Sequence, residues 1–393
     1  MTALTNSCIL PSARPWQVGV MIRQAFLAIT FSFVSLPAIA AGVELPRAPG
    51  TAYGYFAESI APGVTVLHQN DEFHVQPRGN VTIVEQTGGY VLVDSGGSPA
   101  AADQVIEVLA RNTGKPLKAI ILTHWHGDHV LGVSRLLERW PAALVIGTTS
   151  TRDMLSDRKT DRFMPGSDAA ANATFMKNVD EAVAYLDGAA RDKKLLPEER
   201  AGFARAAVEY RQYGHEMKSA RRTPPTVLLE DTIILKDETH PVEIRFFGRA
   251  NTAGDAIAFL PKQRIVATGD IVVSPIPFGS NTYPSEWIKA LERIRALRFD
   301  TMVPGHGRPT KDRARIDTLI AMLKHVRSNV APFAHDQTPE SEVLKKVDLS
   351  QSEAAIAGKD PWLRRWFRAY WRDPIISSAL REARGQPVLQ GED

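Results

Sequence analysis

The sequence has little net charge, a single cysteine and no apolar run long enough to span a membrane. The formal charge of +3 over 393 residues is too small to imply a nucleic-acid partner, and no run of Lys and Arg forms a basic patch. The composition, 44% apolar and 23% charged, is that of a globular protein with a sizeable core and argues against disorder. Low-complexity tracts, internal repeats and a linker that would separate two domains are also missing.

The N-terminal segment has the pattern of an export signal. Arg23 precedes an apolar stretch from Ala25 to Leu36, and the small residues Ala38-Ile39-Ala40 follow at a cleavage spacing. The alternative is an uncleaved membrane anchor. Residues 1–20 lie upstream of this pattern, so Met21 is a second candidate for the start of translation.

Removal of residues 1–40 would take away two arginines and no acids, leaving a formal charge of 45 − 44 = +1. It would also remove Cys8, the only cysteine, and a chain without a thiol suits an oxidising compartment. We therefore expect an exported protein, periplasmic or secreted.

Sequence segments with a strand-like pattern occur in two groups, and each group is followed by segments with a helical pattern. The first group comprises VTVLHQ, NVTIVEQ, YVLVDSG, KAIILT and ALVIGT, and the second comprises TVLLEDTIIL, VEIRFF, DAIAFL and RIVATG. Helical periodicity is expected over residues 98–112, in HVLGVSRLLERW, over 284–297 and over 361–371. Two groups of strands with helices between them predict two sheets packed face to face with helices outside, in one α/β domain.

Two further regions are helical in pattern. Residues 150–223 are rich in Ala, Glu, Lys and Arg and are expected to form a helical insertion, because strand text resumes after them. The predicted organisation is a catalytic domain over 41–335 and a C-terminal helical extension over 336–393 that packs on it. The aromatic residues of PWLRRWFRAYW have helical spacing, which favours burial of that helix over a dimer interface or a membrane-surface contact.

The motif THWHGDHV, residues 123–130, follows the strand KAIILT and places three histidines and an aspartate on a turn at a sheet edge. Neutral imidazole nitrogens and carboxylate oxygens are normal ligands of divalent zinc. His124 and His126 alternate and can point to the same side, whereas Asp128 and His129 can face a second ion. The pattern predicts a metal site at this edge.

Four other motifs also place polar residues where strands end, which is how a sheet scaffold usually builds an active site. They are VLVDSGG with Asp94, GRANTAGD with Asn251, Thr252 and Asp255, VATGDIV with Asp270, and VPGHGRP with His306. The glycines on either side of His306 allow backbone and imidazole to approach a site closely.

These five motifs, in this order over residues 94–306, resemble those of the metallo-β-lactamase superfamily. The resemblance implies an αβ/βα sandwich of two mixed sheets flanked by helices, with metal ions at one edge. It implies the following roles: His124 and His126 bind the first metal; Asp128, His129 and His306 bind the second; Asp270 bridges the two; and Asp94, Thr252 and Asp255 support the ligands without binding metal.

One position departs from the family pattern. The family usually has histidine where this sequence has Asn251, at the third ligand position of the first metal site. An amide oxygen is a neutral and weaker zinc donor than imidazole. Three consequences stay open: two zinc ions with the first held loosely, a single ion in the second site, or a degraded site. Retention of the six other ligands argues against degradation, because buried acids and histidines are costly to keep.

The chemistry that the resemblance implies is hydrolysis by a metal-activated water, whose pKa falls from 15.7 to about 7. Asp128 is the candidate catalytic residue, because it could orient that water or move its proton. Asp270 at the bridging position favours an ester, lactone, thioester or phosphodiester bond, whereas the export pattern favours a β-lactam amide. Two alternatives remain: an iron-dependent redox enzyme of the same fold, and a non-catalytic exported metal-binding protein.

The substrate is expected to be a small molecule, and the helical insertion is expected to form a lid over the metals. Asn281 and Tyr283, in the loop after Asp270, and His215, in the insertion, are the candidate substrate contacts. Trp125 is expected to pack or to lie at the rim. A homo-oligomer stays open.

Overall fold

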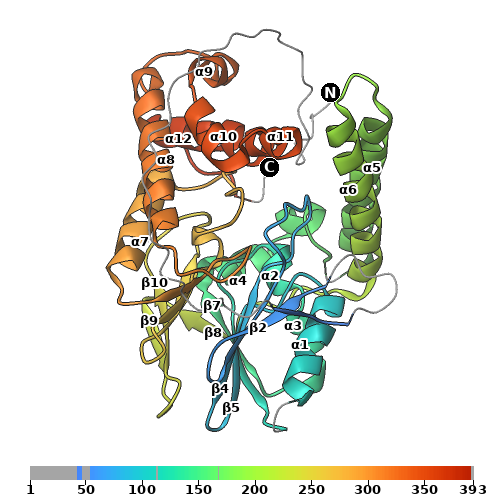
Figure 1. The fold of residues 1–393 in the computed structure, drawn as a ribbon, viewed down its shortest axis with the longest axis vertical. Coiled ribbons are helices and arrows are strands. Elements are labelled where there is room, and N and C mark those ends of the chain that lie inside the picture. Colours follow the sequence, from blue (N-terminus) through green and yellow to red (C-terminus); the bar gives the residue numbers. More distant parts are fainter. Residues whose placement is uncertain (1–41, 47–53, 112–113, 167, 391–393) are drawn as a thin grey trace, which may run out of the picture.

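The computed structural model describes residues 42–46, 54–111, 114–166 and 168–390 (Figure 1). The predicted export signal in residues 1–40 lies outside these ranges. Within them, no helix combines the length and the apolar character that crossing a bilayer requires.

The first sheet contains eight strands among the described residues, and they lie side by side in chain order. They are β1 (Val43–Glu44), β2 (Phe56–Ala61), β3 (Val64–His68), β4 (Val81–Gln86), β5 (Gly89–Val93), β6 (Leu117–Ile121), β7 (Leu144–Thr148) and β8 (Val227–Leu229). The four pairs from β1–β2 to β4–β5 are antiparallel, whereas the pairs β5–β6, β6–β7 and β7–β8 are parallel. The carboxyl ends of β5, β6 and β7 therefore meet at one edge of the sheet.

The second sheet has the order β13-β12-β11-β10-β9. Its strands are β9 (Thr232–Leu235), β10 (Val242–Phe246), β11 (Ala256–Leu260), β12 (Ile265–Ala267) and β13 (Thr301–Val303). Only the β12–β13 pair is parallel; the other pairs are antiparallel. Both sheets are thus mixed.

Alternation of side chains along the strands explains why the sheets stack in layers. On β5, Val91 and Val93 lie in the core between the sheets, while Tyr90 and Leu92 face the helices outside the first sheet. On β11, Ala258 lies in the same central core and its neighbours face the helices outside the second sheet. Each sheet therefore buries both faces, and the predicted αβ/βα sandwich is confirmed.

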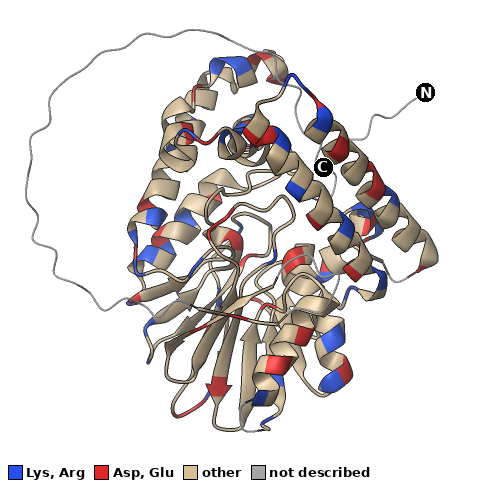
Figure 2. Ribbon diagram, turned by 45° about the vertical axis from the view of Figure 1, so that its right-hand side comes forward, with Lys and Arg blue, Asp and Glu red and all other residues tan. Residues whose placement is uncertain are grey.

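Helices cover the outer face of each sheet (Figure 1). On the first sheet lie α1 (Pro99–Arg111) and α3 (Val133–Arg139), and on the second lie α7 (Pro284–Ala296) and α8 (Ala314–Val330) with α12 (Asp373–Ala383) packed against both. Figure 2 shows acidic and basic residues interspersed along the helices, while the strands carry few charges.

The segment between β7 and β8 is helical. It consists of α4 (Thr149–Ser156), the 3₁₀ turn η1 (Arg158–Arg162), α5 (Ala169–Arg191), α6 (Pro197–Glu216) and the 3₁₀ turn η2 (Met217–Ser219). Helices α5 and α6 form a long antiparallel pair beside the sandwich, shown in green in Figure 1.

The C-terminal helices lie next to the α5–α6 pair. They are α9 (Glu340–Lys346), α10 (Ser350–Ala357), α11 (Pro361–Trp366) and the π-helical turn η5 (Phe367–Arg372), which leads into α12. Arg365 of α11 pairs with Glu199 of α6 at 2.7 Å, and both side chains are largely buried. This contact joins the C-terminal segment to the α5–α6 pair.

Three local expectations need correction. TVLLEDTIIL is not one strand, because the chain leaves the first sheet after β8 and enters the second sheet with β9. HVLGVSRLLERW is not one helix but the short α2 (Gly127–Val130) followed by α3. The aromatic helix over 361–371 changes from α-helical to π-helical at Phe367.

Candidate metal centre

Strand register explains why residues far apart in the sequence meet at one edge. In the first sheet Val93 pairs with Ile121, so Asp94 and the THWHGDHV turn leave adjacent parallel strands together. In the second sheet Ala267 pairs with Val303, and Asp270 and His306 each follow three residues later. The two parallel strand pairs therefore deliver four of the five motifs to one place.

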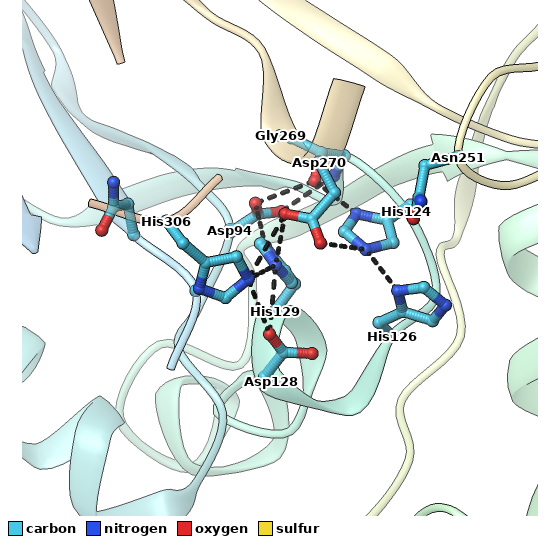
Figure 3. Close-up of polar contacts among 12 residues, drawn as sticks. Asp94, His124, His126, Asp128, His129, Asn251, Gly269, Asp270 and His306 are labelled. Atoms are coloured by element: carbon cyan, nitrogen blue, oxygen red, sulfur yellow. Dashed lines mark hydrogen bonds and ion pairs between the residues drawn. The ribbon is translucent and has the colours of Figure 1, made fainter. Parts of the chain in front are cut away.

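The first group of side chains consists of His124, His126 and Asp270, whose candidate donor atoms all lie within 4.8 Å of one another. His124 Nε2 lies 2.9 Å from His126 Nδ1 and 3.7 Å from Asp270 Oδ2 (Figure 3). His124 Nδ1 is engaged by the Thr123 hydroxyl at 3.0 Å, which leaves Nε2 to face the site.

The second group consists of Asp128, His129 and His306, again with donor atoms within 4.8 Å of one another. His306 Nε2 lies 3.0 Å from Asp128 Oδ2 and 3.3 Å from His129 Nε2 (Figure 3). His306 Nδ1 lies 3.2 Å from the Arg78 carbonyl, so its Nε2 is the nitrogen that faces the group.

Asp270 lies between the two groups. Its Oδ2 faces His124, while its Oδ1 lies 3.1 Å from His129 Nε2 and 3.4 Å from His306 Nε2. The backbone of Gly305 packs directly on this carboxylate, because a Cβ at that position would be only 2.0 Å from Asp270 Oδ1. The glycine before His306 is therefore needed for the carboxylate to reach both groups.

Asp94 binds His129 of the second group on the side of the ring that points away from the other candidate ligands. Its Oδ2 accepts hydrogen bonds from His129 Nδ1 and from the Thr123 hydroxyl, each at 2.8 Å, and its Oδ1 accepts one from the Thr123 amide. Asp94 has φ 61°, a left-handed conformation that aspartate adopts more readily than most other residues with a side chain. Asp94 thus orients the His129 ring so that Nε2 faces Asp128 and Asp270.

Asn251 is buried, with 1% exposure, in the turn between β10 and β11. Its Nδ2 donates a hydrogen bond to the Phe278 carbonyl at 2.7 Å, which fixes the orientation of the amide because only the NH₂ end can donate. Its Oδ1 has no hydrogen-bond partner among the described residues, and the side chain extends toward His124 (Figure 3). Asn251 Oδ1 is therefore available as a weak ligand for a cation at the first group.

Thr252 and Asp255 shape the turn that carries Asn251. The Thr252 amide donates to Asp255 Oδ2 at 2.5 Å, and the Thr252 hydroxyl accepts from the Gly254 amide at 3.1 Å. Burial, followed by the negative charge of Asp270, raises the pKa of Asp255 to about 8. Both residues therefore act on the site through the backbone.

The ionisation of the four histidines differs between the groups. Burial lowers the pKa of His124 and of His126, so both rings are neutral, the form that binds metal. Burial also opposes charge on His129 and His306, but Asp270 and Asp128 outweigh it. They raise the pKa of His306 to about 9 and that of His129 well above its ordinary value.

The donor set fits a pair of divalent cations. Imidazole nitrogens and carboxylate oxygens converge from two sides of Asp270, and Asp270 Oδ1 accepts no well-aligned hydrogen bond despite its two imidazole neighbours.

Zinc binding to the second group is therefore expected to release protons at neutral pH. His129 and His306 have raised pKa values and are protonated below them, so a cation must displace those protons. The apparent zinc affinity should rise by about tenfold per pH unit for each proton released, as long as the pH stays below the raised pKa values of these histidines. Calorimetric titration in buffers of different ionisation enthalpy measures the proton count; zero release at neutral pH would contradict the expectation.

A cavity of about 480 Å³ opens over both groups. Its lining includes His126, Asp128, Asp270 and His306, and its walls come from residues 69–77, the helical insertion, the loop after Asp270 and the C-terminal segment. The apolar part of the lining includes Phe73, Trp125, Phe163, Phe175, Phe278 and Tyr370.

Aromatic rings connect the metal centre to the cavity wall. The ring of His126 lies 5.8 Å from that of Phe278, which lies 5.7 Å from Tyr370, and Tyr370 lies 5.1 Å from Trp366. Tyr370 also donates a hydrogen bond to the Val75 carbonyl at 2.7 Å, which ties η5 to the opposite wall. These contacts hold the walls of a largely apolar cavity above the candidate ligands.

The three candidate substrate contacts, His215, Asn281 and Tyr283, do not line this cavity. His215 is an exposed residue of α6 and does not line the cavity. Tyr283 stacks on Arg249 at the start of α7, 4.3 Å from its guanidinium carbon, and Asn281 accepts a hydrogen bond from Gln390 at 3.3 Å. The loop after Asp270 does reach the cavity, but through residues 273–278.

The cavity walls hold residues that the sequence did not single out. Residues 69–77 carry no recognisable motif, and Phe278 and Tyr370 look like ordinary packing residues until the fold brings them together. Trp125, expected to pack or to lie at the rim, is buried, with 5% exposure, and lines the cavity.

Fold and site together define an αβ/βα sandwich with a two-part His/Asp centre at one edge. The chain belongs to the metallo-β-lactamase superfamily, whose family model, described as "Metallo-beta-lactamase superfamily", matches residues 76–306, more than half of the chain. A metal-dependent hydrolase is the general activity that this membership supports.

Among individual proteins, the linear primary-alkylsulfatase of a Pseudomonas species is 25% identical over 303 residues, which are 72% of this chain and 52% of that protein. The lactamase-like protein notP of an Aspergillus species is 44% identical over 89 residues, 21% of this chain and 27% of that protein. A solved structure of a double mutant of the sec-alkyl sulfatase PisA1 covers 83% of this chain and 49% of its own, with a TM-score of 0.51 and 13% identity, and shares the fold. The chain thus spans about half the length of the alkylsulfatase that it matches.

Proposed function

We propose that this protein is a zinc-dependent hydrolase that cleaves sulfate esters of apolar alcohols. The observation that carries the proposal is the largely apolar cavity of about 480 Å³ directly above the His/Asp centre. A substrate that fits must combine an apolar body with a hydrolysable group at one end. The similarity to a linear primary-alkylsulfatase over 72% of the chain favours a sulfate ester as that group.

The residues that would hold zinc are His124, His126 and Asp270 on one side and Asp128, His129 and His306 with Asp270 on the other. Asn251 would add a weak oxygen donor to the first side. Bound divalent ions would supply a water of lowered pKa and positive charge for the anion that develops during hydrolysis. The reaction consumes one water and yields an alcohol and hydrogensulfate.

Asp128 is the residue best placed to act on the water. Its Oδ2 is engaged by His129 and His306, and its side chain is 14% exposed toward the cavity. Burial raises the pKa of Asp128, but without a bound cation the two histidines outweigh it and hold that pKa far below its ordinary value, and bound divalent cations would supply the positive charge in their place. The carboxylate therefore stays ionised and accepts a hydrogen bond from water, which orients the water rather than storing its proton.

The apolar walls predict a dependence on alkyl chain length. Each methylene that enters the cavity should contribute about 0.8 kcal/mol, so KM for linear alkyl sulfates should fall about fourfold per added carbon until the cavity is filled. Steady-state hydrolysis of a series from ethyl to decyl sulfate measures this dependence. A KM that is independent of chain length would contradict the assignment of the cavity to the alkyl group.

A substrate panel with a chelator control separates the proposal from its rivals. Zinc-loaded protein is assayed with octyl sulfate and with β-lactam, lactone, carboxylic ester, thioester and phosphodiester substrates. Turnover confined to another class, abolished by the chelator, would replace the sulfate ester by that bond. Bound zinc without turnover of any substrate would favour a non-catalytic metal-binding protein, and a coloured protein that carries iron would favour redox chemistry.

A further inference from the structure

The cavity wall formed by the helical insertion carries one cation. Arg162 ends η1 and is the only Lys or Arg among the described residues that line the cavity. Its carbonyl accepts a hydrogen bond from Asn178 of α5 at 2.8 Å. Two residues later Met164 reaches the metal loop, because a Cβ on Gly127 would lie 3.7 Å from the Met164 Cβ. This segment is thus fixed between the insertion and the candidate metal ligands.

The guanidinium of Arg162 has no carboxylate to pair with among the described residues. The adjacent acid, Asp161, is engaged by Arg222 and by Arg158, the latter at 3.4 Å. The ring of Phe163 covers one face of the guanidinium, with the guanidinium carbon 4.6 Å from the ring centre. Nε and Nη2 of Arg162 are both buried and have no hydrogen-bond acceptor in the described ranges.

These two nitrogens form the edge with which an arginine makes two parallel hydrogen bonds to an oxyanion. Leaving such charged donors buried and unpaired is costly, so an acceptor is expected when the site is in use. Trp125 and Trp366, which also line the cavity, have buried indole N–H groups that likewise find no acceptor among the described residues. The lining is therefore rich in donors that lack partners.

None of the acidic residues that line the cavity forms an ion pair with Arg162 among the described residues. Asp128 and Asp270 belong to the metal centre, while Glu72 and Glu181 are exposed at the surface of the protein. Between these acids, the wall consists mainly of aromatic and aliphatic side chains with Arg162 among them.

We propose that Arg162 is a specificity residue that binds the anionic head group of an amphiphilic substrate, whose apolar part fills the cavity. Identification of that head group with a sulfate ester rests on the proposed function, whereas selection for an anion does not. The expected ligand is a linear or aromatic apolar molecule that carries one sulfate, sulfonate or carboxylate.

The test is equilibrium binding to the full zinc-loaded chain, with octane-1-sulfonate, octanol and octyltrimethylammonium as probes. The sulfonate carries the anionic head but has no ester bond, so turnover cannot obscure binding. Quenching of tryptophan fluorescence reports occupancy, because Trp125 and Trp366 line the cavity. The same titrations are made with Arg162→Gln, Arg162→Lys and the control Arg158→Gln, an exposed arginine of the same turn that pairs with Asp168 at 2.6 Å.

Wild type and Arg158→Gln should bind the sulfonate at least about tenfold more tightly than octanol, which is the size expected for a charge-assisted hydrogen bond. Arg162→Gln should lose this preference while still binding octanol, and Arg162→Lys should retain part of it. The ratio of the two affinities is an internal control, since a misfolded variant would lose both ligands. An unchanged ratio in Arg162→Gln would overturn the proposal.

Binding and turnover can also fail separately. Arginine-dependent selection of the sulfonate in a protein that hydrolyses no sulfate ester would support Arg162 as the anion-binding residue and reject the proposed function. Hydrolysis of octyl sulfate with the same KM in wild type and Arg162→Gln would support the proposed function and reject the role of Arg162.

Discussion

Replacing Asp270 by asparagine is expected to lower kcat/KM for the substrate on the order of 10³-fold, the scale seen when one preorganised charged or donor group is removed from an active site. The two carboxylate oxygens of Asp270 face different groups: Oδ2 lies 3.7 Å from His124 and Oδ1 lies 3.1 Å from His129. An amide keeps the volume but loses the negative charge and one of the two acceptor oxygens. Asp270→Asn should therefore weaken zinc binding in both groups at once.

Zinc content after dialysis, together with kcat/KM across the chain-length series, measures the effect of Asp270→Asn. A useful control is Asp153→Asn, which makes the same chemical change at an exposed aspartate that pairs with Arg152. Loss of zinc from only one group, with the other filled at wild-type affinity, would show that Asp270 does not bridge. Full activity and full zinc content would remove Asp270 from the site altogether.

The metal centre could be predicted from the sequence because its signals are local. THWHGDHV carries four donors within a few residues, and each of the other motifs follows an apolar strand. The parallel pairing of β5 with β6 and of β12 with β13 then brings strand ends together without any further information. The same local alternation of apolar residues allowed the two sheets to be predicted.

The cavity could not be predicted in this way, because its walls depend on contacts between segments that are distant in the sequence. Tyr370 meets Val75 across 295 positions, and Phe278 meets Tyr370 only after the C-terminal helices fold back over the sandwich. Closeness in sequence to Asp270 predicts Asn281 and Tyr283 as substrate contacts, and a place in the insertion predicts His215. Neither criterion determines the direction in which a side chain points. No sequence pattern singles out Arg162, because its role is inferred from buried guanidinium nitrogens that have no hydrogen-bond acceptor among the described residues.

Replacing Asn251 by histidine is expected to raise the zinc affinity of the first group by about 10- to 100-fold, the range over which changes around metal ligands alter affinity. Histidine can keep the existing hydrogen bond, because one ring nitrogen can donate to the Phe278 carbonyl that Asn251 Nδ2 now contacts at 2.7 Å. The other nitrogen would then take the place of the amide oxygen that has no partner among the described residues, and a neutral imidazole is a stronger zinc donor than that oxygen.

Equilibrium dialysis measures this effect best in a His306→Ala background, which weakens the second group so that the first dominates the titration. Asn251→Ala in the same background is the matched variant without a donor, and its affinity should fall below that of the parent. Thermal unfolding in the presence of chelator tests whether the larger ring disturbs a residue that is 1% exposed. Equal zinc affinity in the asparagine, alanine and histidine variants would mean that residue 251 holds no metal, and that the first group consists of His124, His126 and Asp270 alone.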